Sequence, residues 1–238
     1  RLERVAAVPD SAAAAFGAAA YPMALVAAKA DPTASETVAT TLGPKTGALS
    51  VPQRELDNPG PWIVIPGAHH LLQRLRSQFP AVSDRWIPQL GVKTGADDLF
   101  LVDEPEPGTR PAVRGRDVGA WRCTPRRHVL WTHGSDGSAL ARLPAAAAQW
   151  LATHEERLRL RTDYKGGPPW QLFRTALGCA CHRVVWADLG RRLGAAVPPP
   201  DVVPLNTVYG IATRTAADAA ALAALFNSRW HSALARLD

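Results

Sequence analysis

The order of hydrophobic and polar positions divides the chain into two parts near residue 60. Residues 1–57 hold short apolar segments that predict strands over 2–8, 21–28 and 37–42, separated by Ala-rich and Pro/Thr/Ser loops. Three strands cannot form an independent core, so we expect them to be edge strands of an incomplete sheet. The turn-rich residues 56–61 are the predicted boundary, and residues 60–238 form the second part.

The second part combines short strand patterns with a few helical ones. Strand-like segments occur at residues 63–65, 99–102, 129–131, 170–173, 183–186 and 207–212. Helical spacing covers residues 69–79 and 144–161, and a last helix begins at Thr215, where Asp218 three residues later is typical of an N-terminal cap. The predicted fold class is therefore mixed α/β (α+β), built from short strands and a few helices.

Positive charge is confined to the second part. The formal net charge is +6, with −1 in residues 1–60 and +7 in residues 61–238. Between residues 110 and 127 the one acid, Asp117, lies among six arginines, which are Arg110, Arg114, Arg116, Arg122, Arg126 and Arg127. Such clustering predicts a surface that contacts phosphates. A solvated loop is the alternative, and arginine-rich usage with abundant alanine also follows from a GC-rich genome.

The triplet Lys93-Thr94-Gly95, at the bend of a predicted turn, raises two enzyme classes that the rest of the chain does not support. A P-loop requires glycine directly before the lysine, and this chain has Val92 there. A penicillin-recognising serine enzyme requires Ser-x-x-Lys, which does not occur. Neither a Gly-x-Ser-x-Gly elbow nor a Gly-x-Gly cofactor turn is present. We therefore expect no catalytic and no cofactor-binding residues in this chain, which argues against an independent hydrolase.

The three cysteines are sparse and odd in number. Cys179-x-Cys181-His182 has zinc-donor side chains, but its spacing is shorter than usual and Cys123 is distant, so we predict no metal site. With no signal-like start and no apolar run of membrane-spanning length, this cysteine usage predicts a cytoplasmic protein that does not contact membranes. The first residue is Arg1 rather than Met, which predicts a fragment or a processed chain.

Several short segments carry a resemblance to a known family, in that family's order. They are residues 91–102, 110–118 with Trp121, 143–144, 169–174, 183–188, 205–211 and 225–228. From about residue 60 onward the chain resembles the C-terminal target-recognition domain of TaqI-like adenine-N6 DNA methyltransferases, including those fused in type IIG restriction–modification enzymes. Asp97 departs from the pattern, because the family commonly has Asn there.

The resemblance implies how the chain is organised. Residues 11–29 look like the last strands of the family's Rossmann-like methyltransferase domain. The catalytic Asn-Pro-Pro-aromatic tetrapeptide and the glycine motif for the cofactor are absent. S-adenosylmethionine and catalysis would then belong to an upstream methyltransferase domain or to a partner subunit, so this chain would be a fragment or one part of a split protein.

The function implied by the charge and the resemblance is sequence-specific binding of double-stranded DNA. The chain would be the target-recognition part of an adenine-N6 DNA methyltransferase of a restriction–modification or related defence system, with the adenine flipped into the upstream domain. The candidate DNA contacts are Lys93, Thr94, Arg114, Arg116, Arg126, Arg127 and Arg174. The alternative is a protein-interaction or assembly module of a larger complex whose DNA binding is incidental.

Overall fold

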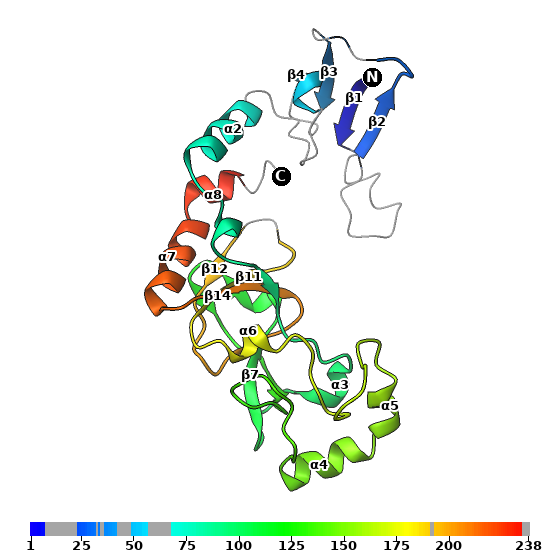
Figure 1. Ribbon diagram of the computed structural model, residues 1–238, viewed down its shortest axis with the longest axis vertical. Helices are drawn as coiled ribbons and strands as arrows, with labels where there is room; N and C mark the ends of the chain where they lie inside the picture. The colour runs from blue at the N-terminus through cyan, green and yellow to red at the C-terminus, as the bar shows by residue number, and fades with distance from the viewer. Residues whose placement is uncertain are drawn as a thin grey trace. The chain divides into compact units, whose positions relative to one another are not determined.

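The structure, a computed structural model, describes residues 1–7, 23–31, 33, 36–41, 49–56, 68–190 and 193–234. The chain separates into two compact units, residues 1–81 with 234–238 and residues 82–233. Figure 1 traces the elements of each unit. The predicted boundary at residues 56–61 lies, after Leu56, outside the described residues, and so does the predicted strand over residues 63–65.

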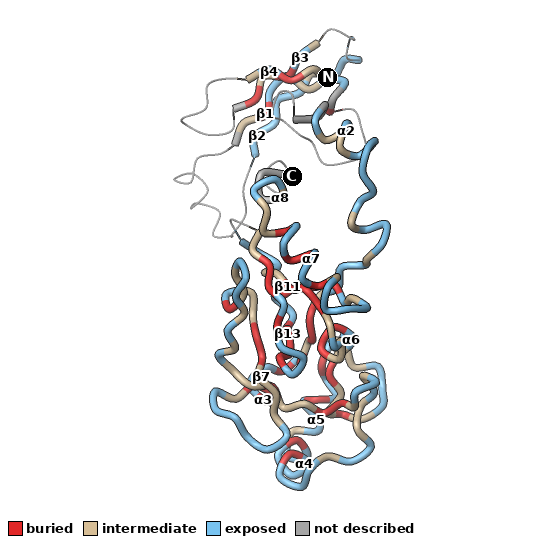
Figure 2. Tube along the Cα trace, turned by 90° about the vertical axis from the view of Figure 1, so that its left-hand side faces the viewer, coloured by how far each residue is buried: buried red, intermediate tan, exposed pale blue. Residues whose placement is uncertain are grey.

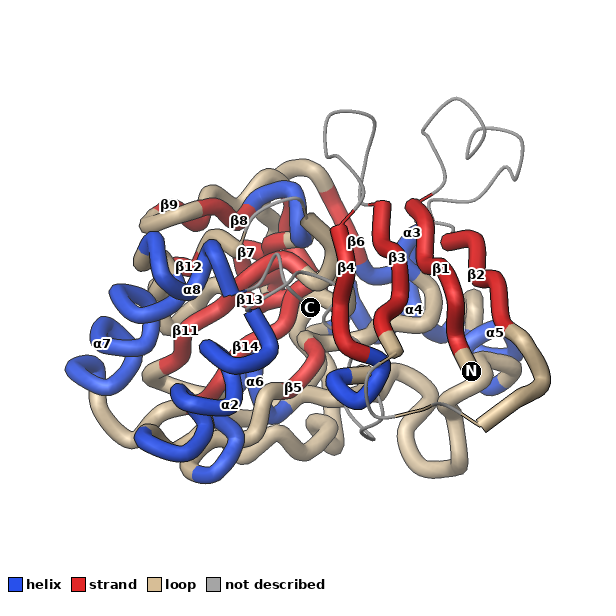
Figure 3. Tube along the Cα trace, turned by 90° about the horizontal axis from the view of Figure 1, so that it is seen from above, coloured by secondary structure: helices blue, strands red, loops and turns tan. Residues whose placement is uncertain are grey.

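The N-terminal unit contains a four-stranded sheet in the order β2-β1-β3-β4 (Figure 3). Its strands are β1 (Leu2–Ala7), β2 (Met23–Ala27), β3 (Thr37–Thr41) and β4 (Leu49–Pro52). The three predicted strands are confirmed, and β4 is an addition. β1 pairs parallel to β3, whereas the other two pairings are antiparallel. The short helix η2 (Gln53–Glu55) and helix α2 (Ala68–Gln78), the latter as predicted, complete the described part of this unit.

A small apolar core lies on one face of this sheet. Val5, Val38 and Val51 are fully buried there, and Leu56 is nearly so. The edge strand β2 differs, because all five of its residues are exposed and its Leu25 side chain is 52% exposed. The sequence predicts edge strands of an incomplete sheet here, and the exposure of the apolar side chains of β2 is a finding of the structure.

The second unit is built around two four-stranded sheets and one small hairpin. The first sheet has the order β13-β7-β10-β6 and the second β12-β11-β14-β5, while β8 and β9 pair only with each other. The strands are β5 (Gln89–Leu90), β6 (Leu101–Val102), β7 (Thr109–Val113), β8 (Val118–Gly119), β9 (Arg122–Cys123), β10 (Arg127–Leu130), β11 (Arg183–Ala187), β12 (Ala195–Ala196), β13 (Val203–Pro204) and β14 (Val208–Ala212). Figure 2 shows the buried positions along β7, β11 and β13 in red. The mixed α/β class is therefore confirmed.

Short helices connect and cover these sheets. They are η3 (Val82–Asp84), α3 (Asp97–Phe100), η4 (Gly115–Asp117), α4 (Ala145–Ala152), α5 (Glu155–Arg159), α6 (Ala176–Cys179), α7 (Ala216–Phe226) and α8 (Arg229–Leu234). The predicted cap of α7 is confirmed, because Thr215 Oγ1 accepts a hydrogen bond from Asp218 N at 3.1 Å. Helix α7 packs Leu222 and Phe226 against the second sheet, in one core cluster with Val184 and Ile211.

Two predicted elements are wrong in extent. The strand expected over 99–102 begins as the one-turn helix α3, because Asp97 and Asp98 occupy the first turn, where carboxylates favour a helix N-terminus. The helix expected over 144–161 is broken into α4 and α5. Thr153 Oγ1 donates to Trp150 O at 2.7 Å at this break, and a threonine hydroxyl that binds backbone competes with continuation of a helix.

A third prediction is also wrong, because residues 170–173 do not form a strand. One isolated bridge joins Phe173 to Lys93, with hydrogen bonds of 2.9 Å in both directions. Arg161 occupies the space beside it: its guanidinium donates to Pro169 O at 2.6 Å and lies 4.7 Å from the centre of the Phe173 ring. Burial lowers the pKa of Arg161 from its ordinary value. The segment is thus held by a buried side chain rather than by strand pairing.

Candidate nucleic-acid interface

The middle of the arginine-rich segment forms the β8–β9 hairpin, whose strands are joined by Ala120 and Trp121. Val118 pairs with Cys123 and Gly119 pairs with Arg122. The base of the hairpin is fixed by Asp117, whose side chain is only 4% exposed. Its Oδ2 accepts a hydrogen bond from Arg114 N at 2.8 Å, and its backbone oxygen accepts one from Thr124 N at 3.0 Å.

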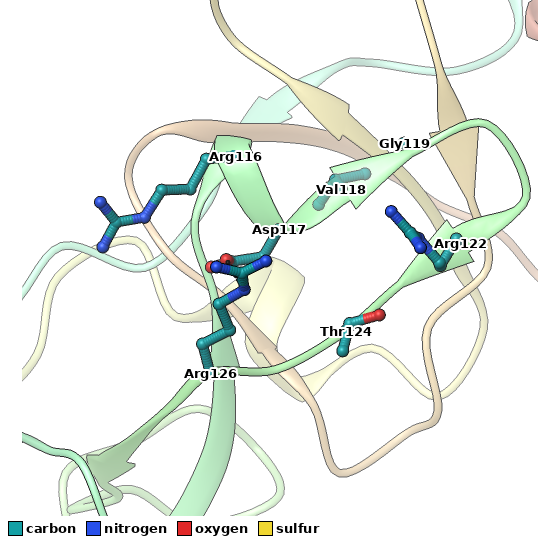
Figure 4. Close-up of a pocket in the computed structure, with 7 residues that line it drawn as sticks. All are labelled: Arg116, Asp117, Val118, Gly119, Arg122, Thr124 and Arg126. Atoms are coloured by element: carbon teal, nitrogen blue, oxygen red, sulfur yellow. Dashed lines mark ion pairs between the residues drawn. The ribbon is translucent and has the colours of Figure 1, made fainter.

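A shallow pocket of about 140 Å³ lies along this hairpin. Its lining, here called the basic pocket, consists of Arg116, Asp117, Val118, Gly119, Arg122, Thr124 and Arg126. The three arginines are exposed. Figure 4 shows the Arg126 guanidinium beside Asp117, Arg122 on the far side of the pocket and Arg116 extending outward. The pocket therefore brings together two predicted contacts, Arg116 and Arg126, with one that was not in the predicted set, Arg122.

Little negative charge balances these three arginines. Arg126 Nε lies 3.4 Å from Asp117 Oδ1, but the Arg126 side chain is 71% exposed, so this pair is weak. In residues 82–190 and 193–233, Arg116 and Arg122 have no ion pair and no side-chain hydrogen bond. Guanidinium groups that are exposed and uncommitted are suited to bidentate binding of phosphate oxygens.

Two other predicted arginines are already paired within the protein. Arg114 Nη2 lies 2.6 Å from Asp97 Oδ2, and Arg127 Nε lies 2.7 Å from Asp103 Oδ1. Both arginine side chains are about one third exposed or less, at 27% and 32%. These pairs connect segments that are distant in sequence, so their first role is to hold the fold around the basic pocket.

Arg110, the first arginine of the cluster, is also committed. It donates to Pro200 O at 2.9 Å and to Asp201 O at 3.1 Å, and its guanidinium lies 4.6 Å from the centre of a Trp131 ring. The buried Arg183 holds the same loop, since it donates to Pro200 O at 3.2 Å and also to Val202 O. Burial lowers the pKa of Arg183 to about 10, so it stays charged at neutral pH.

The turn at Gly91–Gly95 does not expose both of its predicted contacts. Thr94 is 2% exposed, and its hydroxyl donates to Asp97 Oδ1 and accepts from Ala96 N at 3.2 Å. Lys93 is half-buried, and its Nζ lies 2.5 Å from Asp163 Oδ2. The hydrogen bond from Lys93 lowers the pKa of Asp163 from its ordinary value. Thr94 thus shapes the turn, and Lys93 is available to DNA only by leaving Asp163.

Arg174, the last predicted contact, lies at a different hollow. This hollow is lined by Pro88, Gln89, Leu90, Arg174, Ala176 and Tyr209, none of which lines the basic pocket. Arg174 is exposed and has a backbone φ of +56°, which is uncommon for a residue with a side chain. The structure therefore separates Arg174 from the arginines of the hairpin.

Trp121 is the other residue at the hairpin that the predicted contact set did not include. Its side chain is 66% exposed and its backbone φ is +63°. In the sequence, Trp121 is marked by its position beside Arg122 in the arginine-rich segment and by its place in the family resemblance. Exposure of a tryptophan at a two-residue strand connection cannot be read from hydrophobic periodicity, because periodicity assigns such residues to the core.

No group of three His, Cys, Asp or Glu side chains suited to a metal ion occurs in the described ranges. Cys123 and Cys179 are half-buried and Cys181 is exposed. Burial raises the pKa of the Cys123 thiol to about 11, so it is protonated at neutral pH. Where the structure describes the chain, its helices lack the length and apolar content required to cross a bilayer.

Comparisons with known proteins give similarities to solved structures only. No protein-family model matches the chain, and no curated protein matches it. Among the solved structures that it matches is one described as the Type IIL restriction-modification enzyme MmeI in complex with DNA. The sequence identity is 11% and the TM-score 0.49, and the match covers 90% of this chain but 30% of that one. The bound DNA is described for that enzyme.

Proposed function

We propose that this chain binds double-stranded DNA as the target-recognition part of an adenine-N6 DNA methyltransferase in a restriction–modification or related defence system. The observation that carries the proposal is the basic pocket, where three exposed guanidinium groups surround one buried carboxylate. Arg116, Asp117 and Val118 of this pocket belong to residues 110–118, one of the segments that carry the resemblance to the TaqI-like family. The restriction–modification enzyme among the structural matches is consistent with this proposal but does not carry it.

In this proposal the phosphate contacts come from Arg116, Arg122 and Arg126. Arg114 and Arg127 position the segment through their carboxylate partners, and Thr94 is left out because its side chain is buried. Phosphate contacts fix the register of a protein on the duplex, while base edges are read by neighbouring loops. The arginines therefore account for affinity and orientation rather than for the recognised sequence.

Methylation would be carried out elsewhere. S-adenosylmethionine and the catalytic residues belong, in this proposal, to an upstream methyltransferase domain or a partner subunit. The exposed apolar side chains of β2 support this arrangement, because Met23, Leu25 and Val26 are each about half exposed, at 52%, 52% and 49%. Apolar side chains on an edge strand are suited to cover by further polypeptide.

The salt dependence of DNA binding tests the proposal. The full chain and the triple variant Arg116→Ala, Arg122→Ala, Arg126→Ala are titrated with a duplex of mixed sequence over a range of salt concentrations. The slope of log K against log salt is negative, and each lost phosphate contact lowers its magnitude by about 0.9. The magnitude for the triple variant is therefore expected to be lower by about three. A slope equal to that of the unaltered chain refutes the assignment of the pocket.

A matched control removes the same amount of charge elsewhere. Arg142, Arg214 and Arg229 are exposed arginines of the second unit that do not line the basic pocket. Their combined replacement by alanine is expected to change the slope by much less. Equal losses in the two triple variants would indicate non-specific attraction by net charge, which the pocket does not explain.

A second function, an assembly module with incidental DNA binding, is favoured by the exposed apolar side chains of β2. It predicts a tight stoichiometric protein partner together with weak DNA binding that is indifferent to sequence. Replacing Met23 and Leu25 with serine would then abolish partner binding. If the same variant bound a partner unchanged while the arginine variant lost DNA, the assembly function would be rejected.

A further inference from the structure

Trp121 is presented to solvent in a conformation that the chain rarely adopts. Its side chain is 66% exposed at the tip of the β8–β9 hairpin, and its backbone is left-handed, with φ at +63°. A bulky residue is uncommon in this region and persists only where the surroundings fix it. Such strain concentrates at positions that contact ligands, so the tip calls for a functional explanation.

The surroundings of Trp121 do fix it. Its backbone N donates to Ala195 O at 2.8 Å, and the same oxygen accepts a hydrogen bond from Asn227 Nδ2 at 2.8 Å. Asn227 Oδ1 also accepts from Ala195 N at 2.9 Å, so the side chain at the end of α7 holds both polar groups of Ala195. Gly194 lies so close that a Cβ atom there would be 2.7 Å from Ala120 N.

The Trp121 side chain itself is uncommitted. Within the described residues, its indole makes no hydrogen bond and no ring contact. Trp150 shows the contrast, because its Nε1 donates to Leu99 O at 3.0 Å although its side chain is 47% exposed. A rigid backbone therefore presents a free indole at the residue that precedes Arg122, and Arg122 lines the basic pocket.

We propose that Trp121 stacks on the face of a nucleobase while the arginines of the basic pocket hold the adjacent phosphates. This inference rests on the proposed function and adds the contact that an exposed, rigidly held indole provides. Aromatic side chains bind bases through stacking that any base can accept, and inserted side chains occupy the space left where a base step opens. The indole then binds best where the duplex already lacks a stacked base.

The test compares two duplexes of the same sequence, one intact and one with a single abasic site, bound to the full chain. The unaltered protein is expected to prefer the abasic duplex. Trp121→Ala is expected to bind the abasic duplex at least about fivefold more weakly, with an unchanged salt slope, because stacking is lost and no phosphate contact is lost. Trp121→Phe is expected to retain most of the preference, since a phenyl ring also stacks.

Trp230 supplies the control, because it is 76% exposed in α8, and Trp230→Ala is expected to bind like the unaltered chain. If Trp121→Ala kept the affinity of the unaltered chain and its preference for the abasic duplex, the stacking contact would be overturned. A loss of that preference in Trp230→Ala would overturn it as well. If the triple arginine variant still showed a smaller magnitude of the salt slope of DNA binding than the unaltered chain, the proposed function would nevertheless stand. Absence of arginine-dependent DNA binding in the unaltered chain would instead remove the proposed function, and the stacking contact with it.

Discussion

Arg114 Nη2 and Asp97 Oδ2 lie 2.6 Å apart, which joins helix α3 to the residue that precedes η4. Asp97 uses its other carboxylate oxygen to accept the Thr94 hydroxyl. Both carboxylate oxygens of Asp97 therefore have a partner within the protein, Arg114 on one and Thr94 on the other. A carboxylate that neutralises Arg114 also removes that arginine from the charge available to phosphates.

Arg114 and Arg116, two residues apart, are therefore expected to respond differently to replacement by alanine. Arg114→Ala should cost about 0.5–1 kcal/mol of stability, because it breaks a partly exposed ion pair, and should leave the salt slope of DNA binding nearly unchanged. Arg116→Ala should leave stability unchanged and should lower the magnitude of the salt slope of DNA binding by about one. Chemical denaturation and salt titration of both variants measure the two effects. Interchanged results would show that Arg114 is the phosphate contact.

A second prediction concerns Arg183, whose side chain is fully buried among backbone carbonyl groups. It donates to Ala180 O, Pro199 O and Val202 O, so it ties the loop before β13 to β11. Arg183→Met should cost about 3 kcal/mol or more, because the buried carbonyl oxygens lose their donors. Arg183→Lys should recover only part of this loss, because one ammonium group cannot reproduce the planar set of donors.

Denaturation followed by tryptophan fluorescence suits this measurement, because seven of the eight tryptophans lie in residues 82–233. Arg142→Met, at an exposed position, is the control and should change stability by less than about 0.5 kcal/mol. Equal stability of Arg183→Met and the unaltered chain would mean that the loop carbonyls find other partners.

Local patterns predicted the parts of the fold that depend on neighbouring residues. The cap at Thr215 needs only Asp218 three residues later, and β11 and β14 are continuous apolar strands, so all three were predicted correctly. The sequence pattern does not predict the break between α4 and α5. This break depends on the Thr153 hydroxyl, which donates to the backbone oxygen of Trp150 although the same hydroxyl could bind solvent instead. Periodicity alone does not distinguish these two outcomes.

The candidate site was predicted as a segment but not as a set of side chains. Sequence clustering selected residues 110–127, yet Arg110 is committed to the carbonyl of Pro200, ninety positions along the chain. A partner so distant in sequence leaves no local signal. Conversely, Arg122 was left out although the β8–β9 pairing places it in the pocket, because strands of two residues are too short to show alternation.

A third prediction follows from His133, which is 6% exposed and whose pKa burial lowers to about 4. Thr132 Oγ1 donates to Trp170 O at 2.8 Å, so it accepts from His133 Nδ1, 3.1 Å away. The unfolded imidazole titrates near 6.5, so the unfolded chain binds more protons between about pH 6.5 and 4. The contribution of His133 is thus fully present above pH 6.5 and is lost as the pH falls toward 4.

Denaturation at about pH 7 and about pH 4.5 measures this contribution, which should decrease by roughly 2–3 kcal/mol between the two conditions. His133→Asn keeps an N–H for the Thr132 hydroxyl but cannot take up a proton. The variant should therefore lose roughly 2–3 kcal/mol less than the unaltered chain on acidification. Equal acid sensitivity of the two proteins would show that the imidazole is protonated without penalty in the folded state.

The last prediction separates backbone strain at Trp121 from the contact that its indole makes. Both Trp121→Ala and Trp121→Gly remove the indole, but only alanine keeps a Cβ atom in the left-handed backbone, where φ is +63°. That Cβ costs roughly 1–2 kcal/mol, and the greater freedom of glycine in the unfolded chain offsets about 0.5–1 kcal/mol of it.

Trp121→Gly should therefore be more stable than Trp121→Ala by about 0.5–1 kcal/mol, while the two variants bind DNA equally weakly. The same pair of substitutions at Arg174, where φ is +56°, should show the same order of stability and serves as an internal repeat. If alanine were as stable as glycine at residue 121, the tip would be relaxed rather than strained. In that case its exposure alone, and not stored strain, would remain as the sign of a binding role.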